Sequence, residues 1–266
     1  MPNMRIGIAS WSYHRGILSG RMSIEDFIKR AFELNVDGVE LNQRFLKLNK
    51  DYIRKIKRLV LSYGLDISCL TIANNFCLPR KEEREKQVDF VKKWADAALI
   101  LNAPIIRVNA GWPRRLREEE AFNYAVECIK EVCNYTEDYG LVVAVENHGG
   151  ITSTAEQVLK IIKAVNSEWF KVNLDVGNFR ENLYRNIELL APYTVHVHAK
   201  TFQLKLKHED TESYWVETRL DYRKIIEILK NAGYNGYLSL EYEGTEDEET
   251  AVPKSIQFLR YIIKQI

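Results

Sequence analysis

The sequence predicts an α/β protein folded as a single (β/α)8 TIM barrel. Short apolar segments rich in β-branched residues alternate with amphipathic helical segments along the whole 266-residue chain. Uniformly apolar strands are typical of parallel sheets that are covered on both faces. No linker rich in Pro, Gly or Ser interrupts the alternation. The length also fits, because α/β barrels commonly run to roughly 200–250 residues or more as one domain.

Eight strand candidates account for the barrel. In chain order they are Arg5–Ser10, Gly38–Leu41, Leu65–Ile72, Ile105–Asn109, Leu141–Glu146, Phe170–Asp175, Thr194–His198 and Gly236–Glu241. Helical periodicity fills the intervals, with a helix that opens at Ser23 and others over Glu82–Leu101, Glu118–Tyr139, Thr154–Val165, Tyr222–Ala232 and Thr250–Lys264. Gly64, Gly140 and Gly233 stand between a helix and a strand, where a left-handed cap is needed.

We expect residues 1–266 to form one domain. The alternative is an open doubly wound sheet, but Ala9-Ser10-Trp11-Ser12-Tyr13 after the first strand lacks the glycines of a phosphate-binding turn. One long polar connection, at about 200–220, follows the seventh strand. A connection of this length is expected to be a loop that covers the active site or is mobile.

Composition argues against several classes of partner. Lys and Arg number 38 against 37 Asp and Glu, so the net charge of +1 favours neither nucleic acid nor an anionic membrane. No stretch of about 18 apolar residues predicts a membrane span, and no signal peptide is evident. The four cysteines form no CxxC pair, which favours reduced thiols and a cytoplasmic protein. Whether the chain is a monomer or a homo-oligomer stays open.

Four consecutive strands, the fifth to the eighth, end on side chains that can bind a metal. These are Glu146, Asp175, His198 and Glu241. Because barrel strands converge at their carboxyl ends, we expect the four to meet at one divalent cation. Three carboxylates and one imidazole suit Mn²⁺ or Mg²⁺, and Co²⁺ or Zn²⁺ could replace them. The alternative is that these carboxylates only close helix ends or pair with Arg107 and Lys200.

Side chains along a strand point alternately to its two faces, and this alternation identifies the other residues that face into the barrel. His196 points inward one layer deeper than His198, so we interpret it as a hydrogen-bonded core histidine. Glu40 and Arg107 also share the inward face of early strands, and we expect them to form a buried pair.

The strand ends also resemble a known family. Their motifs are Val145-Glu146-Asn147-His148-Gly149, Leu174-Asp175-Val176-Gly177-Asn178, His196-Val197-His198-Ala199-Lys200 and Ser239-Leu240-Glu241-Tyr242-Glu243. With the opening Arg5-Ile6-Gly7-Ile8 and the segment Asp37-Gly38-Val39-Glu40-Leu41, they resemble the xylose-isomerase-like TIM barrels. That superfamily includes tagatose/psicose 3-epimerases, hydroxypyruvate isomerases, inosose dehydratases and endonuclease IV. The resemblance covers nearly the whole chain.

The resemblance implies a sugar isomerase or epimerase that works through a metal-stabilised enediolate. It identifies Glu146, Asp175, His198 and Glu241 as metal ligands, and Glu146 and Glu241 as the acid/base pair that removes and returns a substrate proton. A metal-dependent dehydratase of a keto-polyol is the alternative. A non-catalytic sugar-binding barrel and an endonuclease IV-like repair enzyme are weaker ones.

Departures from the family limit this interpretation. Asn178 stands where many epimerases have a histidine, and asparagine cannot shuttle a proton at neutral pH. No clear match to the epimerases' arginine follows His198. Asn74 or Asn75, and Asn109, stand where endonuclease IV has histidines, and five histidines in the chain are too few for a trinuclear site.

A small carbohydrate is the expected substrate. We expect it to contact polar and aromatic residues at the strand ends, namely His148, Asn178, Lys200, Asn109, Trp112 and Asn74. Arg114, Arg115 and Arg117 could hold a phosphate or carboxylate, although a solvated helix start is the simpler interpretation.

Overall fold

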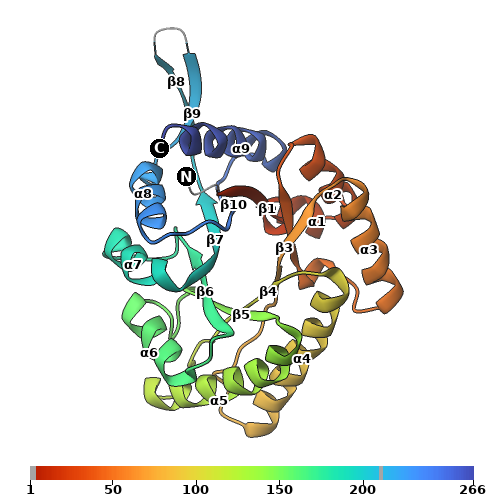
Figure 1. Cartoon of the computed structure of the whole chain (residues 1–266), viewed down its shortest axis with the longest axis vertical. Coiled ribbons are helices and arrows are strands. Elements are labelled where there is room, and N and C mark those ends of the chain that lie inside the picture. The colour runs from red at the N-terminus through yellow and green to blue at the C-terminus, as the bar shows by residue number, and fades with distance from the viewer. Residues whose placement is uncertain (1–3, 210–211) are drawn as a thin grey trace.

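A closed barrel of parallel strands lies at the centre of the computed structural model, which describes residues 4–209 and 212–266. The strand order around the barrel is β1-β10-β7-β6-β5-β4-β3-β2, and helices form a ring outside it (Figure 1). This confirms the predicted α/β class and the (β/α)8 barrel.

The barrel strands agree with the predicted segments to within a few residues. They are β1 (Arg5–Ala9), β2 (Gly38–Asn42), β3 (Asp66–Thr71), β4 (Ile105–Val108), β5 (Val142–Glu146), β6 (Phe170–Asp175), β7 (Thr194–Thr201) and β10 (Tyr237–Tyr242). The helices are α1 (His14–Leu18), α2 (Ile24–Glu33), α3 (Lys50–Ser62), α4 (Lys81–Leu101), α5 (Glu118–Thr136), α6 (Ala155–Val165), α7 (Leu183–Leu190), α8 (Tyr222–Asn231) and α9 (Glu248–Lys264). Short 3-10 turns lie at η1 (Ser10–Tyr13), η2 (Gln43–Phe45), η3 (Glu137–Tyr139) and η4 (Ala191–Tyr193).

Local sequence signals fix where helices begin. At the start of α2 the Ser23 hydroxyl accepts from the Asp26 amide at 3.0 Å, and the Asp26 carboxylate accepts from the Ser23 amide at 3.0 Å. Thr154 and Gln157 form the same reciprocal pair at the start of α6. Such capping boxes satisfy amides that have no partner within the helix, so these helices start at a defined residue.

The main core lies between the barrel and the helices that surround it. Inside the barrel a much smaller apolar cluster is formed by Cys69, Ile105 and Ala144. Above this cluster, toward the carboxyl ends of the strands, the interior is filled by buried polar side chains, including Glu40, Asn173 and His198. The barrel therefore places its buried charge at one end.

The connection after β7 differs from the expected loop. It contains an antiparallel hairpin of β8 (Leu204–Glu209) and β9 (Glu212–Glu217), which projects outside the helix ring beyond α9 (Figure 1). Glu217 fixes the base of this hairpin, because its carboxylate accepts from the amides of Phe202 at 2.8 Å and Arg219 at 2.7 Å. Leu204-Lys205-Leu206-Lys207 alternates apolar and polar residues as a strand does, a short signal that the prediction of a loop overlooked. Residues 1–3, within the expected domain, and 210–211, within this connection, lie outside the described residues.

Candidate active site

The four predicted metal ligands meet inside the barrel at the carboxyl ends of the strands. Glu146 and Asp175 close β5 and β6, while His198 and Glu241 project inward from β7 and β10. One ligand atom from each residue lies within 4.8 Å of those of the other three, and all four side chains are buried. Parallel pairing of adjacent strands produces this convergence, since Asp175 lies beside His198 in the register of β6 and β7. We call these four residues the quartet.

The carboxylates of the quartet surround one nitrogen of His198. Its Nδ1 atom lies 2.9 Å from Glu146 Oε1, 3.8 Å from Asp175 Oδ2 and 3.8 Å from Glu241 Oε2. Burial lowers the pKa of His198, but the carboxylates of Glu40 and Glu241 outweigh it and raise the pKa well above its usual range. The three carboxylates of the quartet therefore favour a positively charged group at their centre.

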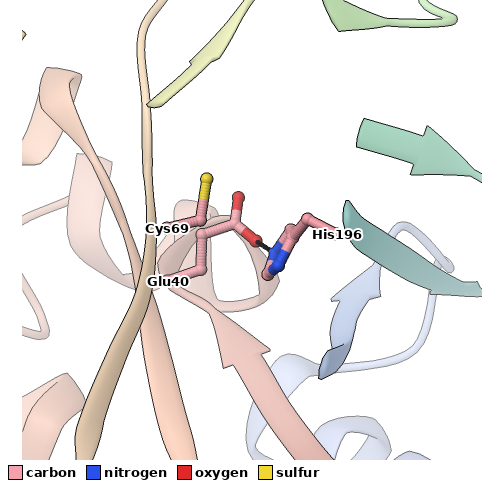
Figure 2. A group of neighbouring side chains, drawn as sticks. All are labelled: Glu40, Cys69 and His196. Carbon is pink, nitrogen blue, oxygen red and sulfur yellow. Dashed lines mark hydrogen bonds and ion pairs between the residues drawn. The ribbon is translucent and has the colours of Figure 1, made fainter. Parts of the chain in front are cut away.

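Glu40 fixes the orientation of His198 from beneath. His196 Nε2 lies 2.8 Å from Glu40 Oε2 (Figure 2). His198 Nε2 lies 2.9 Å from Glu40 Oε1. Burial raises the pKa of the Glu40 carboxyl, but the two imidazoles outweigh it and hold that pKa well below its usual range. A histidine that donates its second N–H to a carboxylate presents the other nitrogen to a metal. His196 is thus a hydrogen-bonded core histidine, as predicted.

The predicted pair between Glu40 and Arg107 is wrong. Arg107 instead contacts Glu146, and Glu40 is engaged by His196, His198 and the Thr71 hydroxyl. The reason lies in the register. Glu40 is level with Cys69 on β3, whereas Arg107 is level with Thr71, two residues nearer the mouth, where Glu146 ends the neighbouring strand β5.

Lys200 is a second buried cation beside the quartet. Its Nζ lies 2.9 Å from Asp175 Oδ2, 3.1 Å from Glu241 Oε2 and 3.0 Å from Glu243 Oε2. Burial lowers the pKa of Lys200, but Asp175 and Glu241 raise it above its usual range, so the ammonium stays charged. Ion pairs with Arg107 and Lys200 were the alternative to a metal site in the sequence analysis. The structure contains both these ion pairs and the convergent quartet.

Three carboxylate oxygens show how a metal ion would fit the quartet. Glu146 Oε2, Asp175 Oδ2 and Glu241 Oε2 are buried and form no regular hydrogen bond among the described residues. Ion pairs with Arg107, His148 and Lys200 offset part of their charge. These oxygens and the Nδ1 of His198, whose Nε2 is held by Glu40, form a hard donor set that fits a divalent cation.

A cavity of about 390 Å³ opens at the mouth of the barrel beside Glu241 of the quartet. Glu241 and Glu243 border it on one side, and His148 with the turns and loops after β2, β3 and β4 border it on the other. Arg107 and His148 line the cavity and separate it from Glu146. A small polar ligand in this cavity would therefore adjoin the quartet.

A profile of the family described as xylose isomerase-like TIM barrel matches residues 28–262. The chain belongs to this xylose isomerase-like TIM barrel family. Among curated proteins, the uncharacterized protein MJ1311 of Methanocaldococcus jannaschii is 25% identical over 178 residues. That match covers 62% of this chain and spans 59% of the relative's length.

Solved structures with the same fold include several whose titles state an activity. Escherichia coli 3-keto-D-glucoside 4-epimerase, YcjR, has a TM-score of 0.76 and 18% identity, over 98% of this chain and 100% of that one. A D-tagatose 3-epimerase-like protein has a TM-score of 0.75 and 20% identity, over 98% and 99%. The probable 3-DHS dehydratase AsbF of Bacillus anthracis has a TM-score of 0.70 and 16% identity, over 98% and 99%. At these identities the likeness concerns the fold.

Four of the six predicted substrate contacts line the mouth cavity, namely Asn74, Asn109, Trp112 and His148, whereas Asn178 and Lys200 do not. The Asn74 amide is engaged with the backbone of Asn109, donating at 2.8 Å and accepting at 2.9 Å. By contrast, Asn109 Oδ1 is buried and has no hydrogen-bond partner among the described residues. Asn109 is therefore better placed than Asn74 to hold a ligand.

His148, Asn178 and Lys200 form a connected group at one edge of the site. Lys200 Nζ donates to Asn178 Oδ1 at 3.0 Å, and His148 Nδ1 lies 2.8 Å from Glu146 Oε2. Burial and then the Arg107 guanidinium lower the pKa of His148 to about 4. His148 is therefore a neutral imidazole at neutral pH, and its ring meets Trp112 edge to face at a centroid distance of 5.7 Å.

Three loops lock together to form one side of the cavity. We call residues 73–77, 109–114 and 148–152 the three-loop wall. Asn75 Oδ1 accepts from the amides of Trp112 at 3.1 Å and Cys77 at 3.0 Å. Gly111 has a φ of +122°, and a Cβ there would lie 2.1 Å from Asn75 Oδ1. A Cβ on Gly150 would lie 2.3 Å from the Gly111 oxygen, so both positions exclude any side chain.

Sequence reasoning missed two residues that matter here. Glu40 was assigned to the wrong partner, because the period of two identifies inward-facing residues but not the level in the barrel that each one occupies. Arg44 was not considered, because it lies on the η2 turn after β2, where no period marks which side chains face the mouth.

Among the described residues, no helix is long and apolar enough to cross a membrane.

Proposed function

We propose that the protein is a divalent-metal-dependent isomerase or epimerase of a sugar or sugar derivative. The observation that carries this proposal is the buried quartet beneath the mouth cavity, with an oxygen on each carboxylate that accepts no hydrogen bond. The sugar epimerases among the similar structures support a carbohydrate substrate.

Glu146, Asp175, His198 and Glu241 would hold the cation. A bound divalent cation polarises a substrate carbonyl and makes the proton on the adjacent carbon more acidic. The chain's part is to orient the ligand and to move that proton. Asn109 Oδ1, which lacks a partner, and the neutral His148 are placed to hydrogen-bond hydroxyls of a ligand in the cavity.

Glu241 and Glu146 are the proposed acid/base pair. They project from β10 and β5, which are separated around the barrel by β7 and β6, so they approach the site from different directions. Proton removal by one and return by the other would place the proton on opposite faces of the carbon. Glu241 borders the cavity, whereas Arg107 and His148 cover Glu146, so those two side chains must move before Glu146 reaches a substrate.

A dehydratase acting on the same site is the second candidate. The observation that favours it is the buried Lys200 ammonium next to Asn178, because a fixed cation stabilises a departing hydroxide. Asn178 also replaces the histidine that many epimerases carry, which weakens the case for epimerisation of a free ketose.

The test combines metal analysis with solvent exchange. Purified protein should contain about one equivalent of a divalent metal, and added metal should raise the unfolding temperature of chelated protein. With that metal restored, candidate keto sugars are incubated in deuterated water. Deuterium at the carbon next to the carbonyl supports isomerisation or epimerisation, and loss of water supports a dehydratase. Absence of bound metal and of any thermal shift with Mn²⁺, Mg²⁺, Co²⁺ or Zn²⁺ would refute the proposal.

A further inference from the structure

Positive charge is distributed unevenly around the mouth cavity. The carboxylates that border it are Glu241 and Glu243, and Lys200 lies within 3.1 Å of both. The opposite side, formed by the turn after β2 and by the three-loop wall, contributes Arg44 and Arg114 together with neutral amides, an indole and His148, while the Arg107 that also lines it is paired with Glu146. The cavity therefore has one neutralised end and one cationic end.

Neither of these two guanidiniums has a carboxylate within ion-pair distance in the described part of the chain. Other arginines near the site are paired, since Arg107 contacts Glu146 and Arg117 lies 3.2 Å from Glu120. Several exposed arginines elsewhere also lack a partner, so a missing partner alone means little. Arg44 and Arg114 differ because they line the same cavity as the quartet residue Glu241.

The backbone beneath each arginine is fixed. The amide of Arg44 donates to Asn42 Oδ1 at 3.0 Å, and the amide of Asn42 donates to the Ser10 hydroxyl at 2.9 Å. Arg114 has a φ of +21° at the end of the three-loop wall, a conformation that non-glycine residues rarely adopt. Such strain persists where the surroundings determine it, as the interlocked loops do here.

We propose that the substrate carries an oxyanion, and that Arg44 and Arg114 bind it while its carbonyl end faces the quartet. This rests on the proposed function for the orientation of the ligand, although the anion subsite itself does not. Guanidinium groups present paired N–H donors that match both carboxylate and phosphate oxygens. The substrate class is therefore a keto sugar acid or a keto sugar phosphate rather than a neutral sugar.

The three arginines after β4, which the sequence analysis considered as one group, have different surroundings in the structure. Arg114 lines the cavity, Arg117 pairs with Glu120 at the start of α5, and Arg115 is exposed outside the cavity. Arg115 is thus a matched control, because it has the same side chain on the same loop and adjoins Arg114.

The experiment measures binding of a matched set of ligands to the metal-loaded protein. D-Fructose, D-fructose 6-phosphate and D-fructuronate serve as neutral, phosphate and carboxylate probes. Calorimetry gives the affinities, and the fluorescence of Trp11 and Trp112, which border the cavity, gives a second readout. We expect at least one anionic probe to bind about tenfold tighter than fructose, with a preference that weakens as salt is added. The stronger of the two anions identifies the oxyanion.

Variants assign that preference to residues. Arg44→Gln and Arg114→Gln should each lower the preference for the anion severalfold, and the double variant should abolish it. Arg115→Gln should leave it unchanged. Equal binding of neutral and anionic probes, or a preference that survives in the double variant, would overturn the inference.

The same experiment separates this inference from the proposed function. Glu241→Gln protein is titrated in parallel, because its affinities do not depend on turnover. If an anion is preferred but no probe is turned over, the anion subsite is supported and the proposed function is not. If neutral sugars are turned over efficiently and no anion is preferred, the proposed function is supported and the anion subsite is not.

Discussion

The two ends of the barrel both contain cavities, and they differ in how their polar groups are paired. The cavity at the amino end is the larger, at about 560 Å³ against about 390 Å³ at the carboxyl end. Two of its charged residues pair with each other, because Asp66 accepts from Arg5 at 2.8 Å and also from the Tyr237 hydroxyl at 2.7 Å. At the carboxyl end the quartet and Asn109 leave buried oxygens without hydrogen bonds.

This contrast shows that unsatisfied polar atoms, and not volume, distinguish a functional end from a structural one. One atom near the amino-end cavity departs from the pattern. His196 lines that cavity, and its Nδ1 has no partner among the described residues. Its other nitrogen, however, belongs to the support of the quartet through Glu40. The following predictions test the contrast, beginning with the largest expected effect.

The largest effect should come from the proposed acid/base carboxylates. Glu241→Gln and Glu146→Gln should each lower turnover about 10³-fold, because the amide keeps the shape but cannot accept a proton. Circular dichroism and the unfolding temperature report whether the fold is retained. Asp66→Asn makes the same chemical change at the amino end and should leave kcat unchanged. A large loss of turnover in Asp66→Asn would remove the distinction between the two ends.

The next effect should be on metal affinity. Glu40→Gln should weaken metal binding about 10–100-fold, since His198 loses the carboxylate that orients it. The readout is the dissociation constant of the metal, measured by competition with a chelator. Ser68→Ala, which removes a bond from the hydroxyl to the Val39 oxygen on the amino side of the same interior, is the control. Unchanged metal affinity in Glu40→Gln would show that Glu40 is only a structural residue.

A stability comparison can be made with two glycines. Gly111→Ala should lower the free energy of unfolding by about 2–4 kcal/mol, because left-handed strain adds to a Cβ placed 2.1 Å from Asn75 Oδ1. Gly233 lies at the amino end with a φ of +78°, and a Cβ there would meet no atom within 4 Å. Gly233→Ala therefore adds only the left-handed strain and should lower the free energy of unfolding by about 1 kcal/mol. Denaturant unfolding measures both. Equal costs would mean that the three-loop wall relaxes freely.

The smallest effect is expected from the amino-end ion pair. Arg5 and Asp66 are largely exposed, with 50% and 61% of their side-chain surface accessible. Arg5→Gln should therefore lower the free energy of unfolding by less than about 1 kcal/mol. Turnover and metal content should not change. A loss of activity in this variant would indicate that the amino-end cavity takes part in function.

The sequence predicted the barrel and the quartet for the same physical reason. Parallel strands buried on both faces leave continuous apolar runs, and the polar side chains that follow such runs lie toward the mouth. Glu146, Asp175, His198 and Glu241 could therefore be located from the ends of the apolar runs, although β7 continues to Thr201 and β10 to Tyr242. The pattern does not say how the strands are staggered, which is why Glu40 was paired wrongly with Arg107.

Two other features left a weak signal or none. The β8–β9 hairpin shows only the short alternation of Leu204-Lys205-Leu206-Lys207 within a connection rich in charged residues. Arg44 is one exposed arginine among many, and only the position of the η2 turn brings it to the cavity, which local periodicity does not encode.

The three-loop wall also bears on how this site could be redesigned. Because Asn75, Gly111 and Gly150 interlock across three separate connections, exchanging any one of these loops with a homologue would break contacts in the other two. Loop grafting would have to transfer all three as one module. The η2 turn is held instead by Asn42 and Ser10, so Arg44 is the position at which substrate charge preference can be altered by a single codon.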